Sequence, residues 1–161
     1  MISSGAQLEI EGELHILCFT ITPGVAGVYF VGILGLELGI DSQEGKSFGF
    51  KVAVGLELAA QWPVVGEVSV MMAIGLEMEW SDKGSGMFAL MIFKGEAEVL
   101  GGIIVIGIHI EAKGGQETET NASGDKETYA ICEVEFAVEV SLAFVIHFEF
   151  DETWQEKRLT S

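Results

Sequence analysis

Three histidines of the chain each stand two residues from a glutamate, a spacing that could bring metal ligands together. The pairs are Glu13 with His15, His109 with Glu111, and His147 with Glu149. Residues i and i+2 of a strand share a face, and imidazole and carboxylate are ligands that metal ions accept. If residues 114–125 form a hairpin loop, however, His147 lies roughly 50 Å along the next strand from the position opposite His109. We therefore expect three solvated His–Glu pairs and neither a metal site nor a cofactor.

No other motif points to catalysis. The chain has no glycine-rich phosphate loop that opens a helix, no nucleophile elbow, no Cys-x-x-Cys pair and no EF-hand loop. Cys18 and Cys132 both fall on apolar strand positions, which predicts small buried side chains instead of a disulfide framework. The sequence therefore predicts that the protein is not an enzyme.

The composition is both apolar and acidic. Hydrophobic residues make up 49 % of the 161 residues, and the formal net charge is -17. Such a field repels nucleic acid and anionic membrane surfaces, which excludes nucleic-acid partners. No apolar run is long enough for a transmembrane helix, and the first residues lack the pattern of a secretory signal peptide. The length predicts one domain over residues 1–161, and the compartment stays unknown.

Alternation of apolar and small or acidic residues dominates the chain. From Val68 to Trp80 every second residue is large and apolar, which indicates a strand with one apolar face. Turn-forming residues separate the runs, and no helix is predicted. We predict seven strands, or eight if the last run bends near residues 139–141. The alternating runs lie at residues 8–20, 34–40, 48–58, 68–80, 88–92, 104–110 and 134–150.

A Gly-Leu-Glu phrase recurs every twenty residues, at 35–37, 55–57 and 75–77. A 13-residue strand spans roughly 43 Å, whereas the seven turn residues of each unit reach at most roughly 25 Å. The chain cannot return to the start of each strand, so neighbouring strands must run antiparallel. The predicted fold class is all-β, an antiparallel up-and-down meander of seven or eight long strands in a barrel or a coiled barrel-like sheet.

Small residues recur on the same face as the glutamates. Glycine and alanine are poor strand residues, and two explanations for them stay open. They allow the sheet to bend, which we favour, or they form a surface for self-association with glutamate at its rim. The residues concerned are Gly35, Gly39, Gly55, Ala59, Ala73, Gly75 and Gly107.

Three architectures could remove the large apolar face from water: a closed barrel with this face inward, a sandwich, and a membrane barrel with this face toward lipid. A narrow membrane barrel would enclose a dozen glutamates with Lys51 as the only evident inward cation, which is costly. A wide pore of several chains escapes that objection. The aromatic residues also form no two girdles in the sequence. We therefore prefer the inward apolar face, with glutamate toward solvent.

The first functional hypothesis is a non-enzymatic, barrel-like protein that encloses an apolar ligand such as a lipid. The alternatives are a pore-forming or membrane β-barrel protein, expected as a multimer, and a self-assembling structural subunit. The partners expected are thus an apolar small molecule or lipid, further copies of the chain, or a membrane. The predicted ligand-binding residues are Phe50, Val52, Val54, Val70, Met72, Ile74, Leu90, Ile106, Ile108, Phe136, Val138, Leu142 and Phe144.

Overall fold

The structure, a computed structural model, contains strands and turns and no helix in the part that it describes. The described residues are 6–21, 25–41, 45–62, 66–121, 123–143 and 145–160. Accordingly, none of these segments contains a helix long and apolar enough to cross a membrane.

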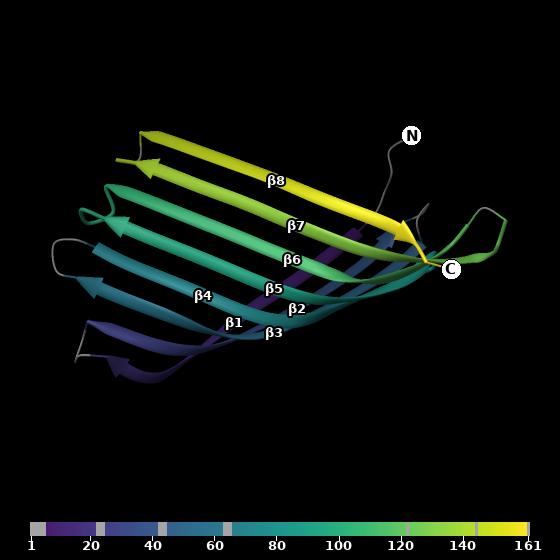
Figure 1. The fold of residues 1–161 in the computed structure, drawn as a ribbon, viewed down its shortest axis with the longest axis horizontal. Helices are drawn as coiled ribbons and strands as arrows, with labels where there is room; N and C mark the ends of the chain where they lie inside the picture. Colours follow the sequence, from purple (N-terminus) through teal and green to yellow (C-terminus); the bar gives the residue numbers. More distant parts are fainter. Residues whose placement is uncertain are drawn as a thin grey trace.

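Eight antiparallel strands form one sheet in chain order, with each strand joined to the next as a hairpin (Figure 1). This confirms the predicted all-β meander. The sheet does not close, because β1 and β8 are its two edges. The strands are β1 (Ala6–Ile21), β2 (Ala26–Asp41), β3 (Gly45–Trp62), β4 (Gly66–Ser81), β5 (Gly84–Val99), β6 (Ile104–Thr120), β7 (Lys126–Leu142) and β8 (Ile146–Leu159).

The last alternating run of the sequence is a hairpin of two strands. β7 ends at Leu142, Ala143 adopts a positive φ of 50°, and the Val145 amide donates to the Leu142 carbonyl. The reversal comes slightly later than the bend predicted at residues 139–141. It places His147 beside Ser141, so the large separation expected between His109 and His147 is wrong.

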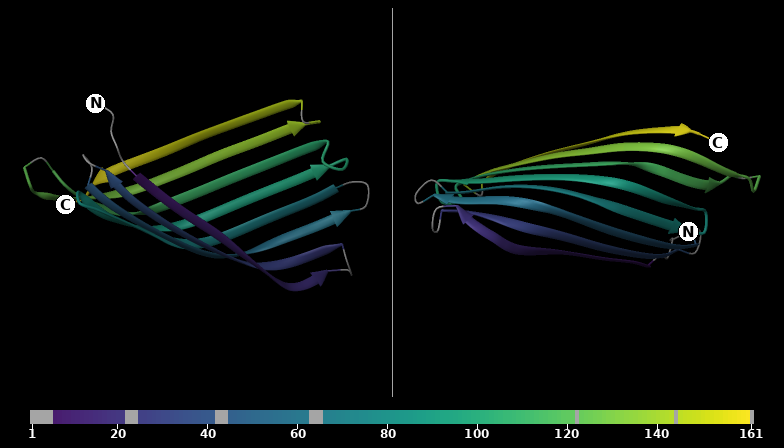
Figure 2. Two further views of the ribbon diagram at one scale, coloured as in Figure 1. Left: turned by 180° about the vertical axis from the view of Figure 1, so that it is seen from behind. Right: turned by 60° about the horizontal axis from the view of Figure 1, so that its bottom comes forward.

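The sheet is strongly coiled (Figure 2), and contacts between side chains of distant strands show the direction of the coiling. Lys94 on β5 contacts Glu13 on β1, with 2.5 Å between Nζ and Oε1. Four strand spacings separate these strands, which would be about 19 Å in a flat sheet. Only a sheet that curls toward this face brings the two side chains together, so the glutamate face is concave and the opposite face is convex.

Two of the repeated glycines lie where the backbones of β3 and β4 approach each other closely. A Cβ atom on Gly75 would stand 2.2 Å from the Val52 carbonyl oxygen, and one on Gly55 would stand 2.1 Å from that of Met72. Real Cβ atoms do not approach backbone atoms so closely. The backbones of β3 and β4 therefore need glycine here, which supports the bending explanation of the small residues.

The buried core lies on the concave face, between the ion pairs. The convex face carries the long apolar columns, and most of its large side chains are exposed. The preferred arrangement, with the apolar columns inward and glutamate outward, is therefore not the one that this sheet adopts. The buried residues are Val31, Ile33, Ala53, Met71, Ala73, Phe88, Leu90, Ile92 and Ile131.

Candidate functional site: two opposed faces

The concave face is acidic because the strand register keeps the glutamates of seven strands on one side. Directly paired residues of neighbouring antiparallel strands share a face. The pairing of Gly35 with Lys51, and of Lys51 with Glu77, carries one such row across the first strands. We call this surface the acidic concave face. Its main charged residues are Glu13, Glu57, Glu77, Glu79, Glu111, Glu117, Glu119, Glu133, Glu135 and Glu139, with Lys51, Lys94, Lys113 and Lys157.

Four lysines on this face form ion pairs that reach past a neighbouring strand. Lys51 on β3 donates to Glu111 on β6 at 2.8 Å. Lys157 on β8 donates to Glu119 on β6 at 2.8 Å. The expectation that Lys51 is the only inward cation is therefore wrong. These ion pairs connect strands that are not neighbours across the concave face, and they partly neutralise the closely spaced carboxylates.

The sequence does not predict Lys94 on this face because the alternation changes phase between β4 and β5, whereas Lys113 and Lys157 lie beyond the predicted strand runs at residues 104–110 and 134–150. Ser81 pairs with Gly84 across a two-residue turn, so the concave positions have odd numbers on β4 and even numbers on β5. Leu90 therefore lies on the concave face, where it is 4 % exposed, and not in the apolar column that the sequence predicts for it. Lys94 lies on the same face of β5 as Leu90, because both have even numbers.

Lys113 supports the middle of the acidic concave face. Its ammonium lies 3.1 Å from Glu79 Oε1, 3.7 Å from Glu77 Oε2 and 4.7 Å from the centre of the Phe88 ring. The side chain is half-buried, so solvent screens these contacts only in part.

We predict that Lys113→Ala lowers the free energy of unfolding by about 1–3 kcal/mol, because two neighbouring carboxylates lose their common partner. Urea unfolding followed by tryptophan fluorescence would measure it. Lys126→Ala, at an exposed strand end, is the matched control and should change stability by less than about 0.5 kcal/mol. Equal losses in the two variants would contradict the role of Lys113.

A hollow of about 330 Å³ on the concave face brings together side chains that the sequence kept apart. It contains His15 from β1 and His109 from β6, with Lys94 between the two strands. His15 Nδ1 lies 2.8 Å from Glu57 Oε2. Each histidine lies within 3.8 Å of the glutamate two residues away, as the spacing predicts, and curvature in addition gathers His15 and His109 in one hollow. Across the described residues, no three His, Cys, Asp or Glu side chains are grouped closely enough to hold a metal ion.

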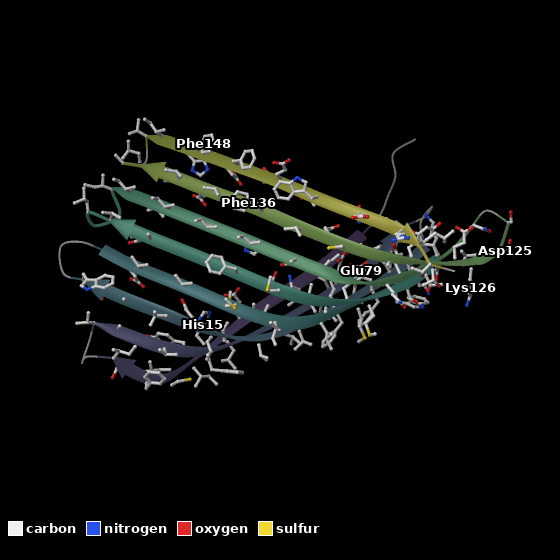
Figure 3. The ribbon with its side chains drawn as sticks, in the orientation of Figure 1. His15, Glu79, Asp125, Lys126, Phe136 and Phe148 are labelled. Atoms are coloured by element: carbon white, nitrogen blue, oxygen red, sulfur yellow. The ribbon has the colours of Figure 1, made fainter. Side chains whose placement is uncertain are left out.

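At one end of the sheet, β6, β7 and β8 are polar on both faces. Asn121 orders the turn between β6 and β7 by accepting hydrogen bonds from the amides of Ser123 and Asp125. Beyond the apolar columns, Tyr129 donates to Glu127 at 2.5 Å, and Asn121 donates to it at 2.9 Å. These two hydrogen bonds lower the pKa of Glu127. Figure 3 shows this end at Asp125 and Lys126, opposite the end that carries Phe148.

The apolar columns of the convex face have an oblique boundary on the side of the polar end. On β1 to β4 they begin in the row that joins Leu8, Leu38, Phe48 and Trp80. In that same row β6 and β7 carry Thr118 and Thr128, and on β8 the unbroken column begins only at Phe150. The row of Phe150 crosses β4 at Val70, ten residues from Trp80.

This offset is confined to the strands that follow β4. The shift of ten residues, about 33 Å along a strand, accumulates over the four strand spacings from β4 to β8, which span about 19 Å. At the opposite side the columns end in nearly one row, with Trp62 on β3, Val68 on β4 and Ile146 on β8. The apolar region of the convex face, which we call the apolar band, is therefore longest on β1 to β4 and shortens toward β8.

The predicted ligand-binding residues lie mainly on this convex face. Leu90 lies on the other face and Phe144 lies outside the described residues; binding of an apolar ligand by the remainder stays a prediction. Those that are exposed are Val54, Val70, Met72, Ile74, Ile106, Ile108 and Leu142. Those that are half-buried are Phe50, Val52, Phe136 and Val138.

The two cysteines were expected to be small buried side chains, and that expectation is wrong. Both are exposed free thiols. Cys132 belongs to the convex face, where no second layer covers β7 in this structure. Cys18 lies at the register shift between Leu17 and Phe19. Their exposure follows from the outward direction of the apolar columns, which the alternation alone does not fix.

No protein family, curated protein or solved structure matches the chain. The arrangement of the two faces is therefore the basis for a functional proposal.

Proposed function

We propose that this protein is a pore-forming membrane protein whose convex face contacts lipid and whose acidic concave face lines a water-filled lumen. The observation that carries the proposal is the separation of side chains by curvature. Branched and aromatic residues are exposed on the convex face, while charged residues form ion pairs on the concave face. An exposed apolar outer face and a charged inner face are the reverse of a water-soluble barrel and typical of membrane barrels. On the inner face the buried apolar residues lie between the ion pairs.

The dimensions of the apolar columns support contact with lipid. The β4 column from Val68 to Trp80 covers thirteen residues, which is about 43 Å at the usual strand rise. At the tilt of about 35–45° that strands of membrane barrels adopt, it would span roughly 30–35 Å along the membrane normal, which is enough to cross the hydrocarbon core of a typical bilayer. Ile74, at the centre of this column, is 64 % exposed, although leaving such a side chain in water is unfavourable.

Tryptophans stand at the boundaries of the apolar band. Trp80 ends the β4 column at the polar end of the sheet, and Trp62 ends the β3 column at the opposite end. Trp154 lies between Glu152 and Glu156, near the oblique boundary on β8. Tryptophan prefers the interface between lipid and water. The positions of the three tryptophans at or near the ends of apolar columns therefore support contact of the convex face with a membrane, and these positions become evident only in the folded sheet.

We predict that the pore conducts cations in preference to anions, because carboxylates outnumber lysines on the concave face. In planar bilayers with a KCl gradient, the reversal potential should therefore lie toward the potassium equilibrium potential. Glu135→Gln, on the concave face, should move it toward zero, whereas Glu156→Gln, on the convex face, should leave it unchanged. Anion preference in the unaltered protein would contradict an acidic lumen.

Release of a trapped dye from lipid vesicles tests the proposal as a whole. We expect release that rises with the ratio of protein to lipid, and recovery of the protein with the vesicles after flotation. Dye retention at every ratio, together with enhanced fluorescence of a lipophilic dye by protein free of membrane, would overturn it. That result would favour enclosure of an apolar ligand instead.

A further inference from the structure

We propose that the pore is closed by several copies of this chain, with the β8 edge of one copy paired antiparallel to the β1 edge of the next. The inference rests on the proposed function, because it assumes a lumen filled with water.

Both edges are open for pairing in the described structure. β1 pairs only with β2, and β8 pairs only with β7. Every residue of β8 is exposed, although the strand is fourteen residues long. Long, uncovered edge strands present a row of free backbone donors and acceptors, which proteins otherwise shield or pair. Such edges cannot lie unpaired in lipid, where no water satisfies them.

The even number of strands makes this pairing possible in a ring. Successive strands alternate in direction, so β1 and β8 run in opposite directions. Around a rotation axis along the pore, every copy has the same orientation, and β8 of one copy meets an antiparallel β1 of the next. The contact is head-to-tail and closes by rotation, and every joint continues the antiparallel hydrogen-bond pattern of the sheet.

Closure of one chain on itself is the less favourable alternative. The interior of an eight-stranded barrel is just wide enough for side chains, so the many carboxylates of the concave face, which outnumber its lysines, would be enclosed with little water. The two edges also lie on opposite sides of the coiled sheet (Figure 2). A ring of several copies widens the lumen and leaves these carboxylates hydrated.

Continuity of the apolar band sets the approximate register of the joint. On β8 the unbroken column runs from Phe150 to Ile146, whereas on β1 it is centred near Leu14. The lipid-facing band stays level only if the next copy is displaced along the strands. This displacement brings Leu14 opposite the stretch from Ile146 to Phe150, with both sets of side chains on the convex face.

Disulfide trapping between two differently altered copies tests the joint. Both chains carry Cys18→Ser and Cys132→Ser; one adds Leu14→Cys, and the other adds Ile146→Cys, Phe148→Cys or Phe150→Cys in turn. The chains are mixed in equal amounts, reconstituted in vesicles and oxidised. We expect a cross-linked dimer of unlike chains with at least one β8 position. Met72→Cys, on the same face in the central strand β4, is the matched control and should give none with Leu14→Cys.

A second cysteine pair, Ile10→Cys with Phe150→Cys, covers the case in which Leu14→Cys does not fold. Two results would overturn the joint while leaving pore formation intact. One is dye release by oligomers that cross-link only β1 to β1 or β8 to β8. The other is dye release by a protein that stays monomeric. Cross-linking of unlike edges without any dye release would support the joint and overturn the pore.

Discussion

Ile74→Arg is expected to prevent insertion of the protein into lipid vesicles. Ile74 lies at the centre of the β4 column, and its side chain is 64 % exposed on the convex face. An arginine at the midplane of a membrane strand costs about 2–4 kcal/mol, which corresponds to a loss of about thirtyfold or more in the equilibrium for insertion. Co-flotation of the protein with vesicles would measure it.

Gln116→Arg is the matched control for this substitution. Gln116 lies on the same convex face, but on β6 at the polar end, beyond the apolar columns. There the arginine would reach water, so vesicle binding should stay within about twofold of the original. If both variants float with vesicles as well as the unaltered chain does, the convex face does not contact hydrocarbon.

Alternation with a period of two was sufficient to predict the strands and their antiparallel order. It was not sufficient to predict which face is concave, because either face of an alternating strand can point inward. The small residues were the feature of the sequence that indicated the direction in which the sheet curves. Gly55 and Gly75 share a face with Glu57 and Glu77, and a coiled sheet crowds the backbone on its inner side.

Strand β5 shows a second limit of prediction from alternation, because its residue types suggest the wrong face as the concave one. In β4 the concave set mixes small, apolar and acidic residues, whereas in β5 it includes Phe88, Leu90 and Ile92 in succession. Those three residues resemble a convex column, so their composition suggested the wrong face. Only the pairing across the turn at residues 82–83 fixes the phase, and it also brings Lys94 toward Glu13.

The hollow on the concave face that contains His15 and His109 shows why contacts between distant strands could not be predicted from the sequence. Along a flat meander, His15 and His109 are separated by four intervening strands. Coiling shortens the path across the concave face, so that both side chains line one hollow with Lys94. The amount of coiling depends on backbone approach at glycine positions in several strands together, which no local pattern in one strand records.

Gly75→Val is expected to destabilise the sheet by more than most substitutions in this protein. A Cβ atom at this position would stand 2.2 Å from the Val52 carbonyl oxygen and 2.7 Å from the Ala53 Cα. Because these are backbone atoms of a paired strand, relief requires β3 and β4 to move apart. Overpacking of this kind costs about 1–3 kcal/mol, and flattening of the sheet would also weaken the ion pairs that cross the concavity.

The free energy of unfolding in urea measures this effect, and Gly32→Ala supplies the control. Gly32 lies on β2, and a Cβ atom there would meet no atom within 4 Å. Alanine at that position should leave stability unchanged or raise it by about 0.5–1 kcal/mol, since alanine loses less backbone entropy than glycine. Equal destabilisation by the two variants would mean that glycine matters for its flexibility alone. A loss confined to Gly75→Val would identify the close approach of β3 and β4 as the feature that turns the glutamates inward.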